Sequence, residues 1–289
     1  CRTRIPVYNT CVTYGNVNDR EAFLAAPEEL ADSLLADGIA AMKIWPFDEA
    51  SVPRMGQSIS DEDLRRGVDV VERITKRAEG RLAVAIEGHA CWNLPSAVKI
   101  ARALEPYGVM FLEDMIAADG YRALAELRSR TTIPICGSER LFGRAEFLSL
   151  LNHQAVDIVM PDILWTGGIT EARKIAAIAD TFQRPVAPHN CGGPIGTLAN
   201  IHFCAHIPNL FRLEVVRAFY HGFYRDLVTE CPKLENGEFH LPTQPGIGAR
   251  LLPEVLKRED AVIEVSETVK SRDHWAQGDP WKDDLGNRF

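Results

Sequence analysis

Short apolar segments alternate with longer amphipathic segments along most of the chain. The short segments are apolar throughout, which is typical of strands that are covered on both faces. Eight such segments are found, at residues 5–12, 39–45, 82–86, 109–112, 133–136, 156–160, 185–187 and 211–215. The pattern therefore predicts a largely parallel sheet.

Helical periodicity fills the gaps between these segments. The clearest helices are expected over residues 61–78, 95–104, 121–128 and 169–179. Ser60 is a good N-cap for the first, and Pro95 suits the first turn of the second. Repeated βα units of this number predict an α/β fold of the TIM-like (β/α)7β barrel type, which needs about 250 residues.

The pattern ends after Val215, where glycine, proline and charged residues take over. We therefore expect a catalytic barrel domain over residues 1–240 and a C-terminal segment over residues 241–289 that packs against another part of the protein.

Composition narrows the class of protein. Hydrophobic residues make up 46% and charged residues 25%, as in ordinary globular domains. The net charge of −8 argues against a nucleic-acid partner, and no apolar run reaches the roughly 20 residues of a membrane span. Seven cysteines without a Cys-x-x-Cys pair indicate a reduced, cytoplasmic protein.

Ionisable residues stand at the ends of the predicted strands, where barrel enzymes keep their active sites. From Glu87 onward they recur every roughly 25 residues, close to the length of one βα unit. The set is Lys43, Glu87 with His89, Glu113, Glu139, Asp162, His189 and Glu214. Taken alone, each residue has an ordinary explanation as a solvated loop residue or a helix cap. Unrelated surface charges, however, would not recur at this regular spacing.

Glu87, Glu113 and Glu139 follow three consecutive strands, so we expect their carboxylates to converge. Carboxylates so placed repel one another unless a cation lies between them, and ligands that are all oxygen suit Mg²⁺. The sequence therefore predicts a Mg²⁺ site. A hydrolase that activates water on a His-rich metal site is disfavoured, because only His89 and His189 stand at strand ends.

Three motifs resemble the enolase superfamily, mandelate racemase subgroup. They are M-P-D-I-L-W-T-G-G-I-T at 160–170, P-H-N-C-G-G-P-I-G at 188–196 and L-E at 213–214. The resemblance implies metal ligands at Glu87, Glu113 and Glu139, a catalytic dyad of His189 and Asp162, and a substrate or proton partner at Glu214.

Within the subgroup, E-G-H-A at 87–90 is similar to acid-sugar dehydratases of the D-galactonate type, as are L-E-P-Y at 104–107 and S-E-R-L-F at 138–142. In those enzymes a histidine at the position of His89 helps the leaving hydroxyl depart. Three positions differ from the usual pattern: Glu87 replaces an aspartate, Trp45 replaces a second lysine, and Ser138 replaces a glycine.

The resemblance implies removal of the proton α to a sugar-acid carboxylate. His189 would be the base, oriented by Asp162, while His89, or His189 itself, protonates the departing hydroxyl. Lys43 would add positive charge at the substrate carboxylate. The product would be a 2-keto-3-deoxy sugar acid.

Two alternatives use the same residues. A racemase, epimerase or cycloisomerase would employ Lys43 as a second base, whereas a degenerate barrel would only bind a ligand. His202 and His206 have the spacing of metal ligands, but their apolar neighbours favour a packed helix. The resemblance further implies an N-terminal α+β capping domain, which this chain is expected to lack, and a homo-oligomer that acts on a small carboxylate.

Overall fold

The computed structural model describes residues 2–262. A compact unit runs to Leu252 and a second begins at Pro253. Most of the C-terminal segment that was predicted from residue 241 falls in 263–289, which lie outside the described residues.

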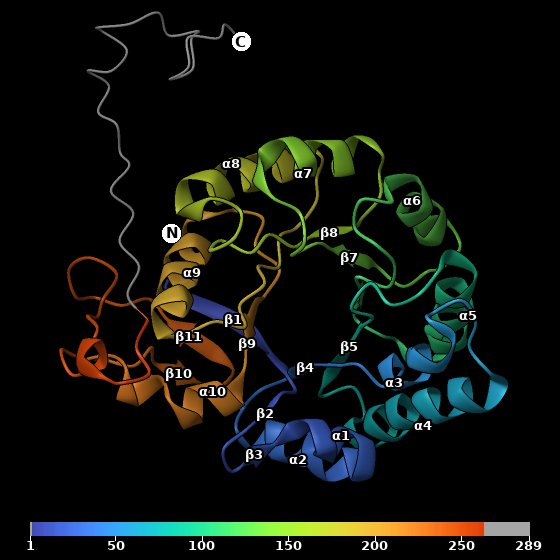
Figure 1. Cartoon of the computed structure of the whole chain (residues 1–289), viewed down its shortest axis with the longest axis horizontal. Helices are drawn as coiled ribbons and strands as arrows, with labels where there is room; N and C mark the ends of the chain where they lie inside the picture. The colour runs from blue at the N-terminus through green and yellow to red at the C-terminus, as the bar shows by residue number, and fades with distance from the viewer. Residues whose placement is uncertain (1, 263–289) are drawn as a thin grey trace, which may run out of the picture. The chain divides into compact units, whose positions relative to one another are not determined.

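A parallel sheet forms the centre of the first unit (Figure 1). Its strands pair in the order β9–β1–β4–β5–β6–β7–β8. Single parallel bridges then join Val159 of β8 to Val186, and Val186 to Leu210. The strand bounds are β1 Arg4–Thr10, β4 Ala41–Ile44, β5 Ala83–Glu87, β6 Leu112–Glu113, β7 Ile135–Gly137, β8 Ile158–Val159 and β9 Leu213–Val215.

One segment expected to be a strand is not one. Residues 185–187 carry only the isolated bridges at Val186. Pro185 and Pro188 flank this position, and a proline has no N–H to donate to a neighbouring strand. The prediction of a strand at 185–187 is therefore wrong, although the segment still lies between β8 and the residues before β9.

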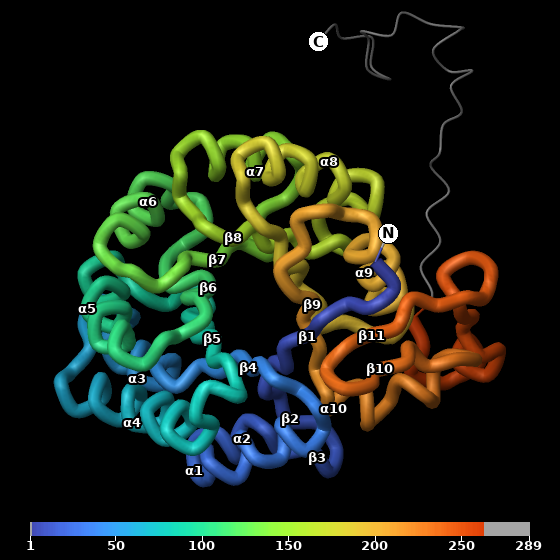
Figure 2. The backbone as a smooth tube through the Cα atoms, turned by 180° about the vertical axis from the view of Figure 1, so that it is seen from behind, coloured from blue at the N-terminus to red at the C-terminus, as the bar shows by residue number. Residues whose placement is uncertain are grey.

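Helices surround the sheet (Figures 1 and 2). The helix bounds are α1 Asp19–Ala25, α2 Pro27–Ala36, α3 Asp48–Ser51, α4 Asp61–Ala78, α5 Leu94–Leu104, α6 Tyr121–Ser129, α7 Gly143–Asn152, α8 Gly168–Thr181, α9 Pro194–His206 and α10 Arg217–Gly222. The helix predicted at 61–78 is confirmed, and Ser60 caps it by accepting a hydrogen bond from the Asp63 N–H. No helix among the described residues is long and apolar enough to cross a membrane.

Two small hairpins complete this unit. Strands β2 Thr13–Tyr14 and β3 Val17–Asn18 follow β1, while β10 Leu234–Glu235 and β11 Glu238–His240 come after α10. β11 pairs antiparallel with β1, so the sheet is mixed. The sequence pattern after residue 215 indicated neither α10 nor this hairpin.

The inside of the sheet is filled by small and aromatic side chains. Tyr8 and Phe111 meet edge to face with ring centroids 5.7 Å apart. The other buried members of this cluster are Ala41, Ala85, Cys136, Ile158, Met160 and Ala187. The ammonium of Lys43 lies 5.8 Å from the Tyr8 ring, so this apolar layer supports the charged residues described next.

Candidate active site

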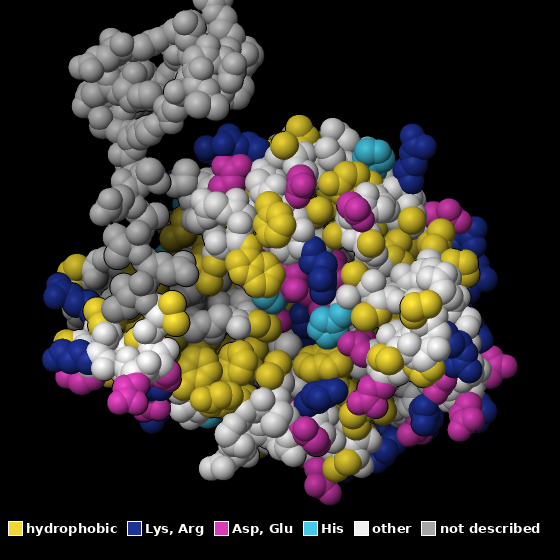
Figure 3. All heavy atoms as spheres, in the orientation of Figure 1, with side chains coloured by type: hydrophobic (Ala, Val, Ile, Leu, Met, Phe, Trp, Pro, Cys, Tyr) yellow, Lys and Arg dark blue, Asp and Glu magenta, His cyan; other side chains and the backbone are white. Residues whose placement is uncertain are grey.

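Strand register brings the predicted residues to one edge of the sheet. Glu87 pairs with Glu113 across β5 and β6, and Thr10 pairs with Lys43 across β1 and β4. An isolated bridge joins Asp162 to His189. Charged side chains and histidines gather at a hollow in the middle of one face, with hydrophobic side chains around them (Figure 3).

The hollow contains a cavity of about 320 Å³. Predicted residues that line it are Lys43, Glu87, His89, Glu139, Asp162 and His189. The other lining residues are Thr10, Val12, Trp45, Leu164, Trp165, Cys191 and Gly192. Glu113 and Glu214 do not line this cavity, and both are fully buried.

Lys43 joins three carboxylates. Its Nζ lies 2.8 Å from Glu113 Oε1, 2.9 Å from Glu214 Oε1 and 3.2 Å from Glu87 Oε2. Burial alone would lower the pKa of Lys43, but the charges of Glu113 and Glu214 raise it well above its ordinary value. The side chain is therefore held as an ammonium ion.

One lysine does not neutralise the acids around it. Glu113 Oε2 is buried and has no hydrogen-bond partner. Burial and the neighbouring charge of Glu87 raise the pKa of Glu113 well above its usual range. An unpartnered oxygen beside a second carboxylate is the environment that a divalent cation stabilises, so Glu87 and Glu113 fit a hard, oxygen-binding metal.

Glu139 lies differently from the expected cluster of three glutamates. Its Oε2 contacts His189 Nε2 at 2.9 Å. Within residues 2–262, the group of three potential ligands whose atoms all lie within 4.8 Å of one another is His189, Cys191 and Glu214. Glu87, Glu113 and Glu139 do not reach that spacing together in this arrangement of side chains.

His189 and Asp162 form the expected pair. His189 Nδ1 lies 2.7 Å from Asp162 Oδ2, and both side chains are buried. Asp162 is held by its other oxygen, Oδ1, which accepts hydrogen bonds from the N–H groups of Leu164 and Trp165. A carboxylate on Nδ1 leaves Nε2 to face Glu139, which lines the cavity, and Glu214, which is buried behind it.

His89, which lines the same cavity, belongs to a second His–Asp pair that the sequence did not reveal. His89 Nδ1 lies 2.5 Å from Asp48 Oδ2. Asp48 opens α3, a single turn after β4. Burial lowers the pKa of His89, but the hydrogen bond to Asp48 and the charges of Glu87 and Asp48 together raise the pKa above the ordinary value.

Three differences from the family pattern have local consequences. The longer side chain of Glu87 turns back so that Oε1 accepts a hydrogen bond from the His89 N–H at 2.8 Å. Trp45 packs edge to face on His89 with ring centroids 5.6 Å apart. Ser138 donates a hydrogen bond to Asp114 Oδ2 at 2.8 Å.

Thr10 and Cys191 are the other residues that the sequence did not single out. Thr10 donates a hydrogen bond to Glu214 Oε1. Cys191 follows His189 by two residues, and burial raises the pKa of its thiol to about 11. Both could have been found from their position: Cys191 is close to His189 along the chain, and Thr10 pairs with Lys43 across β1 and β4.

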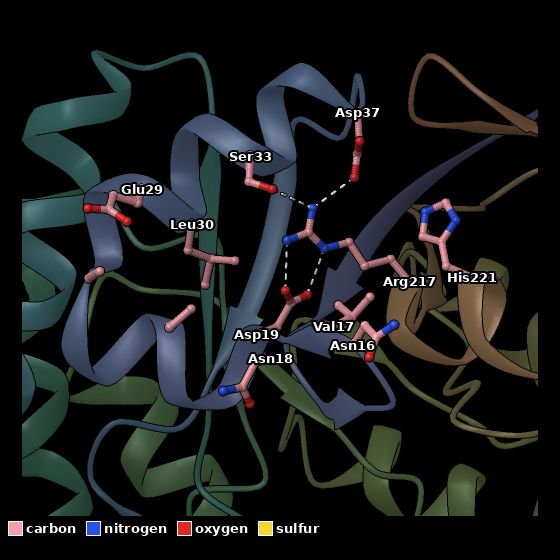
Figure 4. A pocket seen from close by; sticks show the side chains of 12 residues that line it. Asn16, Val17, Asn18, Asp19, Glu29, Leu30, Ser33, Asp37, Arg217 and His221 are labelled. Atoms are coloured by element: carbon pink, nitrogen blue, oxygen red, sulfur yellow. Dashed lines mark hydrogen bonds and ion pairs between the residues drawn. The ribbon is translucent and has the colours of Figure 1, made fainter.

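A larger cavity, of about 520 Å³, lies beside α1 and α2 and contains Arg217 (Figure 4). Asp19 receives two hydrogen bonds from this guanidinium, at 2.7 and 2.8 Å, and Asp37 and Ser33 receive the others. Every nitrogen of the guanidinium is thus bonded within the fold. Arg217 therefore joins α10 to α1 and α2, and we assign its guanidinium to the fold and not to a substrate.

Comparison with known proteins agrees with this geometry. Residues 26–255 match the family described as enolase C-terminal domain-like. The D-xylonate dehydratase of Haloferax volcanii is 35% identical over 68% of this chain and 48% of its own length. The D-gluconate dehydratase of Thermoproteus tenax is 31% identical over 92% of this chain and 52% of its own length. The chain thus spans about half the length of these curated relatives.

Solved structures show the same relationship. An enolase of the mandelate racemase subgroup from Agrobacterium tumefaciens is 41% identical with a TM-score of 0.80, covering 89% of this chain and 66% of its own. An enolase protein from Sargasso Sea sequences is also 41% identical, with a TM-score of 0.82 over 90% of this chain and 67% of its own. The chain belongs to the enolase superfamily, with neighbours in its mandelate racemase subgroup.

Proposed function

We propose that this protein dehydrates a sugar acid in a Mg²⁺-dependent reaction that begins with removal of the proton α to the carboxylate. The observation that carries the proposal is that two histidines, each bound to an aspartate, line one cavity beside buried glutamates; the pairs are His189–Asp162 and His89–Asp48. Two oriented imidazoles provide for two proton transfers, one from carbon and one to a departing hydroxyl. The names of the relatives, which are dehydratases of xylonate and gluconate, support the same class of substrate.

Glu87, Glu113 and Glu139 are the proposed metal ligands. Bound there, Mg²⁺ supplies positive charge at the substrate carboxylate, where negative charge develops as the α-proton leaves. Members of the enolase superfamily use this ion generally. Glu87 and Glu113 present the oxygen donors that it prefers, and Glu139 would have to leave its contact with His189 to join them.

Lys43 and Glu214 hold the substrate carboxylate and the base in place in this proposal. The ammonium of Lys43 adds a second positive charge, and Glu214 lies between it and His189. Because Lys43 is kept protonated, it is poorly suited to accept a proton from carbon. This weakens the runner-up function, a racemase, epimerase or cycloisomerase that uses Lys43 as a second base, and the charged cavity weakens the non-catalytic barrel.

His189 takes the α-proton through Nε2, while Asp162 holds Nδ1–H. Although burial opposes it, the charge of Glu214 and the bond to Asp162 raise the pKa of His189 well above its usual value. A cation shared by the neighbouring carboxylates would lower this pKa and favour the neutral imidazole that a base requires.

His89 then gives a proton to the hydroxyl on the next carbon. The carbon–oxygen bond breaks and water leaves. The enol that remains tautomerises to a 2-keto-3-deoxy sugar acid. Asp48 orients His89 for this step, as Asp162 orients His189.

The finer architecture is part of the proposal. The bridges at Val186 support closure of the sheet into a (β/α)7β barrel between β8 and β9. Large apolar side chains remain exposed in the segments that follow β4, β7 and β8, namely Val52, Met55, Phe142, Leu164 and Trp165. We propose that a capping region covers them and that residues 241–289 contribute to it.

Free thiols at Cys91, Cys191 and Cys231 support a reducing, cytoplasmic setting.

A substrate screen tests the function. The protein, with Mg²⁺, is incubated with a library of mono- and diacid sugars, and 2-keto acid formation is followed with a carbonyl reagent. We expect turnover of one or a few sugar acids and loss of turnover when EDTA removes the metal. Exchange of the α-proton without a keto acid would instead favour the racemase alternative, and neither reaction on any substrate would contradict the proposal.

A further inference from the structure

Two different sets of metal-binding groups lie in the wall of the cavity and directly behind it. Glu87 and Glu113 offer only oxygen, which suits Mg²⁺. His189, Cys191 and Glu214 offer nitrogen, sulfur and oxygen atoms that all lie within 4.8 Å of one another. Thiolate and imidazole favour softer metals such as zinc over magnesium.

The spacing of the second set fits a single small ion. Ligand distances of about 2.0–2.3 Å to Zn²⁺ place tetrahedral neighbours roughly 3.3–3.8 Å apart. His189 Nε2 and Glu214 Oε2 are 3.8 Å apart.

The surroundings also suit a bound cation. Asp162 holds His189 Nδ1 at 2.7 Å, which is the carboxylate–histidine arrangement that orients ligands in zinc sites. The Asn190 N–H donates to Glu214 Oε2 at 2.8 Å and fixes the position of that oxygen. Cys191 is only partly buried and lines the cavity, so an ion can reach it.

We propose that His189, Cys191 and Glu214 bind a thiophilic divalent cation such as Zn²⁺ or Cd²⁺, at a site separate from that of Mg²⁺. On binding, the sulfur coordinates as a thiolate and its proton passes to the buffer, with no change of oxidation state. The metal occupies His189 Nε2, the atom that takes the substrate proton, so it inhibits the enzyme. The inhibition rests on the proposed function, but the binding does not.

Cadmium titration tests the binding directly. Cd²⁺ is added to the protein in excess Mg²⁺, and the ultraviolet charge-transfer absorption of the cadmium–thiolate bond is recorded. Zn²⁺ affinity is measured by calorimetry under the same conditions. We expect one equivalent of each to bind, and Asp162→Asn to weaken Zn²⁺ binding by about 10–100-fold.

Cysteine variants identify the ligand. Cys191→Ala should abolish the cadmium–thiolate absorption of the bound Cd²⁺ equivalent. It should also weaken Zn²⁺ binding more than Asp162→Asn does. Cys91→Ala and Cys231→Ala are matched controls, because both remove a partly buried free thiol outside the proposed site, and both should keep the signal. Cys191→Ser serves in place of Cys191→Ala if the latter does not fold.

Two results would overturn the proposal: a cadmium signal that survives in both Cys191 variants, or Zn²⁺ binding that Mg²⁺ displaces in simple competition. Inhibition is measured separately, as the ratio of rates with and without Zn²⁺ on a substrate found by screening. If no sugar acid is turned over, the proposed function fails while the absorption still reports on the site.

Discussion

At the scale of single residues, the strand ends could be located because the parallel strands from β5 onward recur at nearly constant spacing along the chain. Lys43, His189 and the acids could be placed from that spacing and from family motifs. Asp48 could not, because it reaches His89 only through a one-turn helix that directly follows β4. The contact between Glu139 and His189 was also beyond the sequence, because it depends on side-chain rotation.

The proposed role of Asp48 predicts that its substitution affects dehydration but not exchange of the α-proton. Asp48→Asn removes the charge that orients His89, so dehydration should slow at least about tenfold. Exchange of the α-proton with solvent, which uses His189, should continue at close to the wild-type rate. Both rates are measured on one sample by NMR in deuterated buffer with the substrate found by screening.

The matched control for Asp48→Asn is Asp61→Asn. Asp61 is highly exposed and pairs with Lys99, also on the surface, so neither rate should change. Equal slowing of exchange and dehydration in Asp48→Asn would show that Asp48 supports the fold and not the second proton transfer.

At the scale of elements, prediction succeeded where a helix carries its own signals. α4 combines a long amphipathic pattern with the Ser60 cap, and its bounds were predicted as found. α1, α2 and α7 lack a side-chain cap and were not predicted, whereas α6 and α8 lack one too and were predicted from their amphipathic pattern alone. Short elements such as β8 owe their conformation to neighbouring strands, which local sequence does not report.

Arg217 should stabilise the contact of α10 with α1 and α2. Arg217→Met leaves the carboxylate of Asp19 buried without its main partner, and breaking such a buried ion pair costs about 3–5 kcal/mol. Urea denaturation measures the free energy of unfolding. Arg77→Met, which removes an exposed ion pair with Asp32, should lower the free energy of unfolding far less, because solvent screens an exposed pair.

A loss in Arg217→Met no larger than in Arg77→Met would contradict this role. The double variant Asp19→Asn with Arg217→Met should recover part of the lost stability, because it removes the uncompensated charge as well.

At the scale of the whole molecule, the repeated βα pattern predicted the α/β class and the order of the parallel strands. It did not predict the antiparallel β10–β11 hairpin beside β1, because that pairing joins residues far apart in the chain. The boundary near residue 240 remains a prediction, as does the role of residues 241–289 in a capping region.

Metal binding should be visible in the stability of the whole protein. If buried glutamates hold Mg²⁺, an ion concentration of 100 times the Kd adds about 2.7 kcal/mol to the free energy of unfolding. Thermal melts with Mg²⁺ and with EDTA measure the shift. Glu113→Gln should lose most of it, whereas Glu126→Gln, which alters an exposed pair with Arg130, should keep it. An unchanged melting temperature in the wild type would contradict the metal site.

The central claim is that His189 removes the proton α to a carboxylate. The most direct measurement is NMR of the α-proton in deuterated buffer with Mg²⁺, comparing the wild type with His189→Asn. We predict that the wild type loses this signal and forms a keto acid, while the variant is slower in both by at least about 10²-fold. Loss of the α-proton signal at an undiminished rate in a folded His189→Asn variant would contradict the account.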